Sequence, residues 1–230
     1  MRFQDAARDA RAVVYAGIQA DPQVARTAAL LADASLGQRV LARAVMNGET
    51  TDPEIWRAMF PTLFGASAAD DASALARSEA ILAMSLAVAD RGEQVRSQVR
   101  GALVEELTAQ LLARRVGPAG VHRERRILFD GVRAEIHPYD VTVERDGASE
   151  AYDCKWGARG INADVLHQLD DARTHAADED VPLGVALVVF DAHRSCEVRL
   201  ARQTAPHERT AVVTLESLDE LAGSRTGTRS

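Results

Sequence analysis

Residues 134–156 read AEIHPYDVTVERDGASEAYDCKW, and this stretch decides the fold. Val, Tyr and other strand-forming residues occur in two segments, residues 134–145 and 149–156. Asp146-Gly147 separates the two segments, and such a pair favours a tight hairpin turn because both positions accept a positive φ angle. We therefore predict two adjacent antiparallel strands.

The sequence on either side of this hairpin predicts an α/β fold. Residues 121–129 form a third strand-like segment, which ends at a second turn signal, Asp130-Gly131. A continuous apolar run at residues 185–190 is typical of a strand covered on both faces. The remaining expected elements are helices at residues 93–115 and 162–177, a strand near 211–214 and a short helix from Leu215. This order of helix, three strands, helix and strand predicts a sandwich around a mixed central sheet.

The first 92 residues predict an all-α region. Ala, Leu and Val recur at spacings of three and four in residues 2–20, 23–46 and 72–89. Asp21-Pro22 ends the first of these helices. Thr51-Asp52-Pro53-Glu54 begins a shorter one, because Asp or Thr caps a helix and Pro is accepted at its first position.

Length and composition indicate a globular protein with two domains. The chain has 230 residues, of which 47% are hydrophobic, enough for a sizeable core. The two cysteines have neither metal-binding spacing nor a disulfide pattern, which fits a reducing cytoplasm. No signal sequence and no run of about 18 apolar residues is found, so we expect a cytoplasmic protein without membrane contact. The expected parts are a helical bundle domain over residues 1–92 for dimerisation or target selection, an α/β domain over 93–222 and a flexible tail over 223–230.

The formal charge of -7 argues against indiscriminate binding to polyanions, but one stretch of the chain is basic. Residues 114–133 contain six Arg residues and only two acids, Glu124 and Asp130. This stretch can follow a phosphate backbone, or it can be a solvated helix end and edge strand. The sequence leaves both interpretations open.

Lys155 is the only lysine of the chain, although Lys and Arg together number 27. Lys carries a compact charge whose pKa moves readily on burial, whereas Arg is planar and stays protonated. Asp140 and Asp153 lie in the two hairpin strands, so strand pairing can bring their carboxylates together. Lys155 projects from the same face as Asp153, and Cys154 between them points the other way, as expected of a small core residue. The alternative is that an Arg-rich composition retained one lysine by chance.

Two carboxylates and a backbone carbonyl form a set of hard oxygen ligands that suits Mg²⁺. A lysine beside such a metal can hold or help to deprotonate the attacking water and offset the charge that builds on pentacoordinate phosphorus. Taken singly, Asp140 and Asp153 can also be ordinary salt-bridge partners of Arg133 or Arg159.

A third acid is expected from the helix that precedes the strands. Glu105 shares a helical face with Ala102, Ala109 and Leu112, so it can point inward among small residues. Glu106 is the alternative, because periodicity alone does not separate adjacent residues.

The ordered set of Glu105, Asp140 and Asp153-Cys154-Lys155 resembles the PD-(D/E)XK nuclease superfamily, which has the restriction-endonuclease-like αβββαβ core. Residues 101–112, GALVEELTAQLL, are similar to the opening helix of methyl-directed restriction endonucleases. The resemblance covers about residues 93–222, and it departs from the family pattern at Tyr139, where a proline is usual.

The resemblance implies an active site. Glu105, Asp140 and Asp153 would coordinate Mg²⁺ or Mn²⁺, the carbonyl of Cys154 would be a further ligand, and Lys155 would be the catalytic lysine. Gln168 matches a glutamine that many members of the superfamily carry on the following helix.

These residues predict a metal-dependent DNA endonuclease that serves bacterial defence, restriction or DNA processing. Cleavage of both strands implies a homodimer, because one such site cuts one strand at a time. Two alternatives stay open. One is a nuclease-fold module that binds nucleic acid or a partner protein without cutting it, and the other is a nuclease for RNA or branched DNA.

Overall fold

The computed structural model describes residues 1–6, 10–133, 137–145, 147–205 and 210–223. The chain divides into two compact units, one of residues 1–10 with 108–230 and one of residues 11–107. The expected boundary between residues 92 and 93 differs from this division, which falls inside a helix, α7 (Glu93–Val116). The predicted tail, residues 223–230, lies outside the described residues except for Gly223.

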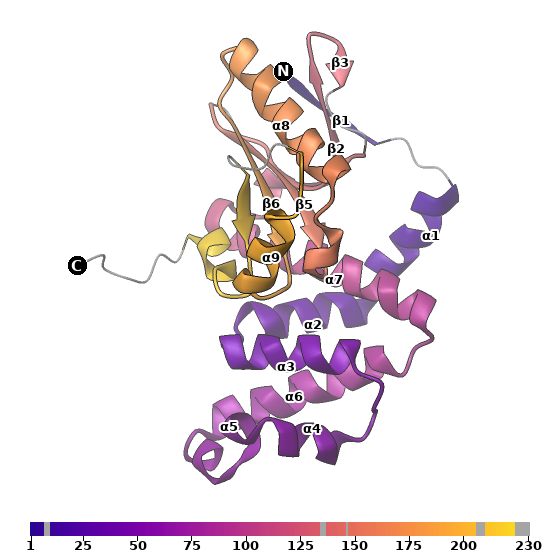
Figure 1. Ribbon diagram of the computed structural model, residues 1–230, viewed down its shortest axis with the longest axis vertical. Helices are drawn as coiled ribbons and strands as arrows, with labels where there is room; N and C mark the ends of the chain where they lie inside the picture. Colours follow the sequence, from indigo (N-terminus) through magenta and orange to yellow (C-terminus); the bar gives the residue numbers. More distant parts are fainter. Residues whose placement is uncertain (7–9, 134–136, 146, 206–209, 224–230) are drawn as a thin grey trace, which may run out of the picture. The chain divides into compact units, whose positions relative to one another are not determined.

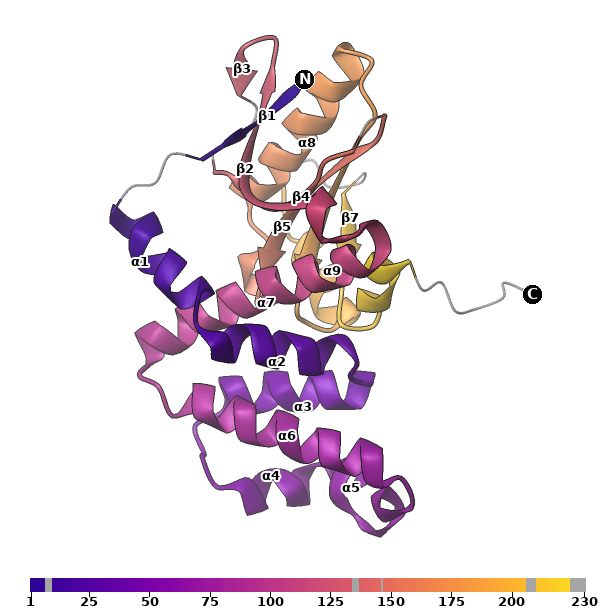
Figure 2. The same ribbon diagram turned by 180° about the vertical axis from the view of Figure 1, so that it is seen from behind.

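The sheet unit confirms the predicted α/β class and its mixed sheet. Among the described residues the sheet has seven strands: six follow the order β1-β2-β4-β5-β6-β7, and β3 pairs with β2 (Figures 1 and 2). Neighbours are antiparallel from β1 to β5, whereas β5, β6 and β7 run parallel. The strands are β1 (Arg2–Asp5), β2 (Val121–Phe129), β3 (Val132–Arg133), β4 (Tyr139–Val143), β5 (Ser149–Lys155), β6 (Leu183–Val189) and β7 (Ala211–Val213).

Both predicted hairpins form. Asp130 and Gly131 join β2 to β3 with φ angles of 43° and 86°, the left-handed values that an Asp-Gly turn accepts. The turn between β4 and β5 contains Gly147 at a φ of 81°. Asp146 and residues 134–136, which were also expected in the turn and the strand, lie outside the described residues.

Helices cover both faces of the sheet. Leu166 and Leu169 of α8 (Ala163–Asp178) are buried in one cluster with Ala151 of β5. In the C-terminal part of α7, Thr108 contacts Cys154 of β5 and Arg115 contacts Glu150 of the same strand. Because strand side chains alternate between faces, α7 and α8 pack on opposite sides of β5. The other helical elements of this unit are α9 (His193–Leu200) and three 3-10 turns, Pro118–Gly120, Ala158–Gly160 and Leu218–Ala222.

Residues 2–5 form a strand, so the prediction of a helix over residues 2–20 is wrong at its N-terminal end. Arg2 and Phe3 pair with Leu128 and Ile127 of β2 in antiparallel register, and the helix α1 begins only at Ala10. The local pattern is compatible with a helix, but backbone hydrogen bonds to a strand more than 100 residues away decide the conformation.

The helical unit confirms the predicted all-α character of the region after residue 10. Its starts carry the expected chemistry: Asp21 and Asp52 cap helices whose first residues are Pro22 and Pro53. Gln38 joins two helices, because its amide donates 3.0 Å hydrogen bonds to the carbonyl of Ala74 and to Oγ of Ser78. The helices are α1 (Ala10–Gln19), α2 (Pro22–Ala32), α3 (Leu36–Asn47), α4 (Pro53–Met59), α5 (Pro61–Phe64), α6 (Ala72–Ala89) and the first half of α7, with a 3-10 turn at Ala66–Asp70.

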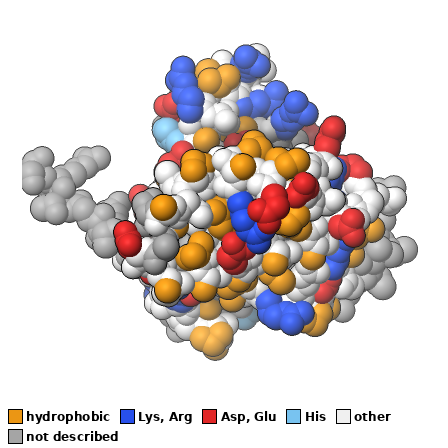
Figure 3. Space-filling model, turned by 90° about the horizontal axis from the view of Figure 1, so that it is seen from below, with side chains coloured by type: hydrophobic (Ala, Val, Ile, Leu, Met, Phe, Trp, Pro, Cys, Tyr) orange, Lys and Arg blue, Asp and Glu red, His pale blue; other side chains and the backbone are white. Residues whose placement is uncertain are grey.

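Within the described part of the chain, α6 is the one helix whose length and apolar composition would suffice to cross a membrane. Core helices of soluble proteins have the same properties, and α6 buries Ile81, Leu82 and Val88. Figure 3, which views the molecule from below, shows acidic and basic side chains interspersed among hydrophobic ones on that face.

Candidate functional site

Asp140 and Asp153 lie on neighbouring strands at the predicted hairpin. The register pairs Val141 of β4 with Tyr152 of β5, so Asp140 and Asp153 are each one residue beyond this last recorded pair, at the same end of the two strands. The backbone N–H of Cys154 also donates a 2.6 Å hydrogen bond to Oδ2 of Asp140. This contact places the carboxylate of Asp140 beside the backbone of the residue that follows Asp153.

Lys155 interacts electrostatically with the same pair of acids. Its ammonium forms an ion pair with Oδ1 of Asp153, whose side chain is 8% exposed, while the lysine side chain is 27% exposed. Burial alone lowers the pKa of Lys155, but the carboxylates of Asp153 and Asp140 outweigh that effect and raise the pKa above its ordinary value. Asp153, Asp140 and Lys155 thus interact electrostatically at this end of β5.

Cys154 has the structural role that strand alternation predicts. Its Sγ atom is buried and lies 3.5 Å from Oγ1 of Thr108 on α7. The side chain thus points away from Lys155, and only the backbone of Cys154 faces Asp140.

Gln168 links α8 to the chain segment that leads into β4. The side chain is buried, and its Oε1 accepts a 3.1 Å hydrogen bond from the backbone N–H of His137. The carbonyl of Gln168 also accepts a 3.3 Å hydrogen bond from the hydroxyl of Tyr139, the residue next to Asp140. These contacts hold the segment just before Asp140 against the helix.

Glu105 is the buried member of the Glu105 and Glu106 pair, as its helical face predicts. It is 5% exposed, and its two carboxylate oxygens accept hydrogen bonds of 2.6 Å from the Tyr15 hydroxyl and 2.7 Å from Nε2 of Gln19. Tyr15, Gln19 and Glu105 belong to the helical unit, whereas Asp140, Asp153 and Lys155 belong to the sheet unit. Among the described residues, no three His, Cys, Asp or Glu side chains form a group that could hold a metal ion.

Asp191 is a residue that sequence analysis did not single out. It lies two residues after the end of β6, and its carboxylate accepts hydrogen bonds of 3.0 Å from the N–H of Ala158 and 2.8 Å from the N–H of Ala192. Asp191 thereby holds the start of the 3-10 turn that begins three residues after Lys155. No local motif marks this role, because the two partners are 33 residues apart in the chain.

The basic stretch of residues 114–133 is partly neutralised within the fold. Arg115 pairs with Glu150, and Arg125 pairs with Asp5 and, at 2.7 Å, with Glu144. These two guanidinium groups therefore support the sheet rather than presenting uncompensated charge to a ligand.

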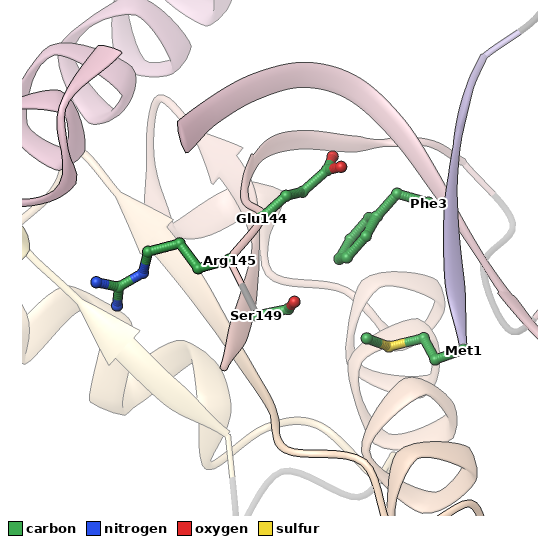
Figure 4. A pocket seen from close by; sticks show the side chains of 5 residues that line it. All are labelled: Met1, Phe3, Glu144, Arg145 and Ser149. Atoms are coloured by element: carbon green, nitrogen blue, oxygen red, sulfur yellow. The ribbon is translucent and has the colours of Figure 1, made fainter. Parts of the chain in front are cut away.

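A separate pocket lies at the other end of β5, where the strand begins. Its volume is about 520 Å³, and it is lined by Met1, by Phe3 of β1, and by Glu144, Arg145 and Ser149 of the β4–β5 hairpin (Figure 4). Ser149 is the first residue of β5 and Asp153 lies four residues further along the strand, so a spacing of about 3.3 Å per residue separates the two by roughly 13 Å.

Comparison with known proteins adds no relative: no protein-family model, no curated protein and no solved structure matches the chain. The interpretation of the site therefore rests on the residues and contacts described above.

Proposed function

We propose that this protein is a Mg²⁺- or Mn²⁺-dependent DNA endonuclease with a restriction-endonuclease-like core. The observation that supports it best is the juxtaposition of Asp140 and Asp153 on paired strands, with the only lysine of the chain ion-paired to Asp153. The succession of α7, the β2–β5 meander, α8 and the parallel strand β6 agrees with the αβββαβ order of that core.

The donor set fits a hard divalent cation, because carboxylate oxygens are the ligands that Mg²⁺ and Mn²⁺ favour. Asp140 and Asp153 would hold the ion, together with the backbone carbonyl of Cys154. When bound, such an ion supplies Lewis-acid polarisation of a phosphodiester.

Lys155 provides the positive charge of the proposed reaction. Its ammonium would orient the attacking water and stabilise the negative charge that develops on the phosphoryl oxygens. Attack of the water oxygen on phosphorus forms one P–O bond and breaks the bond to the leaving sugar oxygen, which takes up a proton. Gln168 acts at a distance by holding the segment next to Asp140.

Plasmid cleavage tests this proposal. The native protein should nick or linearise plasmid DNA with Mg²⁺ or Mn²⁺ and not with EDTA, and Lys155→Ala and Asp140→Asn should each lower the rate at least about 100-fold. Asp171→Asn is the matched control, because Asp171 is an exposed acid on α8. Circular dichroism of each variant at the assay temperature shows that it is folded.

Glu105→Gln belongs in the same series, because the family resemblance names Glu105 as a ligand. Metal-dependent cleavage that continues undiminished in Lys155→Ala would rule out the proposed site. We further propose that double-strand cleavage requires a homodimer, for which sedimentation of the protein with a short duplex is the direct measurement.

A second candidate function is a module that binds nucleic acid or a protein without cutting it. It is favoured by the pairing of Asp153 with Lys155, which balances the charge of that acid within the chain. This function predicts salt-dependent DNA binding that weakens in Arg114→Ala and Arg126→Ala, with intact plasmid under every metal condition. RNA and branched DNA substrates in the same assay test the remaining nuclease alternatives.

A further inference from the structure

Gly160 approaches the stem of Lys155 more closely than any other residue type allows. A Cβ atom placed on Gly160 would lie 2.9 Å from each of Cβ, Cγ and Cδ of Lys155. Such separations are well inside normal van der Waals contact, which begins at about 3.5 Å between carbon atoms. Either the turn that contains Gly160 or the lysine must move to admit a larger residue.

The turn is fastened at both ends. The N–H of Ala158 donates to the Asp191 carboxylate at 3.0 Å, and Nε of Arg199 donates to the carbonyl of Ile161 at 2.8 Å. Inside the turn, the N–H of Gly160 donates to the carbonyl of Gly157 at 2.9 Å. Two of these contacts tie the turn to separate segments, at Asp191 and Arg199, so a shift of the turn would break several hydrogen bonds together.

The backbone of Lys155 is fixed as well. Lys155 pairs with Val189 in the parallel ladder of β5 and β6, and its carbonyl accepts a 2.9 Å hydrogen bond from the N–H of Phe190. The side chain beyond Cβ is the part that can move. An added methyl group at position 160 would therefore push Cγ and Cδ of the lysine away from Asp153, while the remaining contact with Cβ of Lys155 would require a small shift of the turn.

We propose that Gly160 is a positioning residue for Lys155. The bare Cα of Gly160 provides the space in which the lysine stem lies, while Asp191 and Arg199 keep the turn in place beside it. The resulting geometry directs the single ammonium onto Asp153. The inference rests on the proposed function only for its consequence in cleavage, because the placement of the lysine can be measured by itself.

The sole lysine makes the measurement direct. Protein grown on lysine labelled with ¹³C at Cε gives one side-chain signal, from Lys155. Gly160→Ala should move this signal toward the position of an exposed lysine and sharpen it. The control Gly184→Ala should leave the signal unchanged, because a Cβ there meets its nearest side-chain atom, Cγ of Glu150, at an ordinary 3.5 Å. An unchanged signal in folded Gly160→Ala would overturn the inference.

A double variant guards against a general loss of folding. If Gly160→Ala acts through the lysine stem, its effect on the urea midpoint should be smaller in a Lys155→Ala background, where Cγ and Cδ are gone. Equal effects in both backgrounds would overturn the inference.

Cleavage separates this inference from the proposed function. If the native protein cleaves DNA, Gly160→Ala should lower the cleavage rate about 10-fold or more, and Gly184→Ala should leave that rate unchanged. A full cleavage rate in Gly160→Ala, despite a shifted lysine signal, would overturn the positioning role. A native protein that cleaves no substrate would refute the proposed function, and the lysine signal would still decide whether Gly160 places Lys155.

Discussion

The buried side chains of Asp153 and Glu105 each have specific ion-pair or hydrogen-bond partners. The Asp153 carboxylate is paired with the Lys155 ammonium, and the Glu105 carboxylate accepts hydrogen bonds from two neutral donors. A charge without such a partner would destabilise the fold, because its hydration is lost on burial. The two acids differ in the partners shown for them: Asp153 pairs with the Lys155 ammonium, whereas Glu105 accepts hydrogen bonds from a hydroxyl and an amide.

Tyr15→Phe should destabilise the helical unit. The substitution removes the 2.6 Å hydrogen bond to Oε1 of Glu105 and leaves a buried carboxylate with one donor fewer. We expect the free energy of unfolding to fall by about 1–3 kcal/mol, measured by urea unfolding. Glu106→Gln is the comparison, because Glu106 is only partly buried. Equal stability of Tyr15→Phe and the native protein would mean that the hydrogen bond to Glu105 contributes nothing in solution.

Several helices in this protein begin where a side chain accepts a hydrogen bond from a backbone N–H group of the first helical turn. Asp21 caps α2 through a 2.8 Å hydrogen bond from the N–H of Gln23, and Ser35 and Gln38 form a reciprocal capping box at the start of α3. These caps matter because the first N–H groups of a helix have no partner within it. The sequence predicts the break at Asp21-Pro22 and the start at Asp52-Pro53, but it does not predict the division of residues 23–46 into α2 and α3 at Ser35.

Asp21→Ala should lower the stability of α2 in a pH-dependent manner. The N–H of Gln23 and then Arg91, 3.0 Å away, hold the pKa of Asp21 below its ordinary value of 3.8. A lowered pKa means that the stabilisation is fully present above pH 3.8 and is lost as the pH falls through the folded-state pKa. We expect a loss of about 1 kcal/mol near pH 7 that shrinks at lower pH.

Asp21→Asn is the matched variant, because Asn caps a helix as well as Asp but lacks the charge that faces Arg91. Urea unfolding of the three proteins from about pH 7 to pH 3 separates the two effects. A deficit in Asp21→Ala that stays constant over this range would show that the ionised carboxylate is not what stabilises α2.

At the scale of the whole molecule, the N-terminal strand completes a sheet built from the C-terminal half of the chain. β1 pairs with β2 along Arg125–Leu128, and Asp5 forms an ion pair with Arg125. Without β1, this edge of β2 would expose unpaired backbone N–H and C=O groups, which promote aggregation.

Deletion of residues 2–5 should therefore destabilise the sheet unit. The lost hydrogen bonds and the Asp5–Arg125 pair predict a decrease on the order of 2 kcal/mol in the free energy of unfolding, together with a stronger tendency to aggregate. Thermal unfolding with light scattering measures both. A synthetic peptide of residues 1–6 should restore part of the stability and a scrambled peptide should not, whereas an unaffected deletion variant would contradict the pairing of β1 with β2.

The sequence by itself determined the α/β class, both Asp-Gly hairpins, the capped helix starts and the pairing of the strands that carry Asp140 and Asp153. These features are local: turn chemistry, capping and strand alternation depend on residues a few positions apart. The same alternation places Cys154 away from Lys155, as the structure confirms.

Only the tertiary structure decided the remaining features. Residues 2–5 become a strand because a distant edge of β2 supplies their hydrogen bonds, and α7 is divided between two units because its two ends pack on different partners. The closeness of Gly160 to Lys155 depends on Asp191 and Arg199, which are more than 30 residues from their hydrogen-bond partners. Contacts at such separations leave no periodic pattern in the sequence, since they are set by how the elements pack and not by their spacing along the chain.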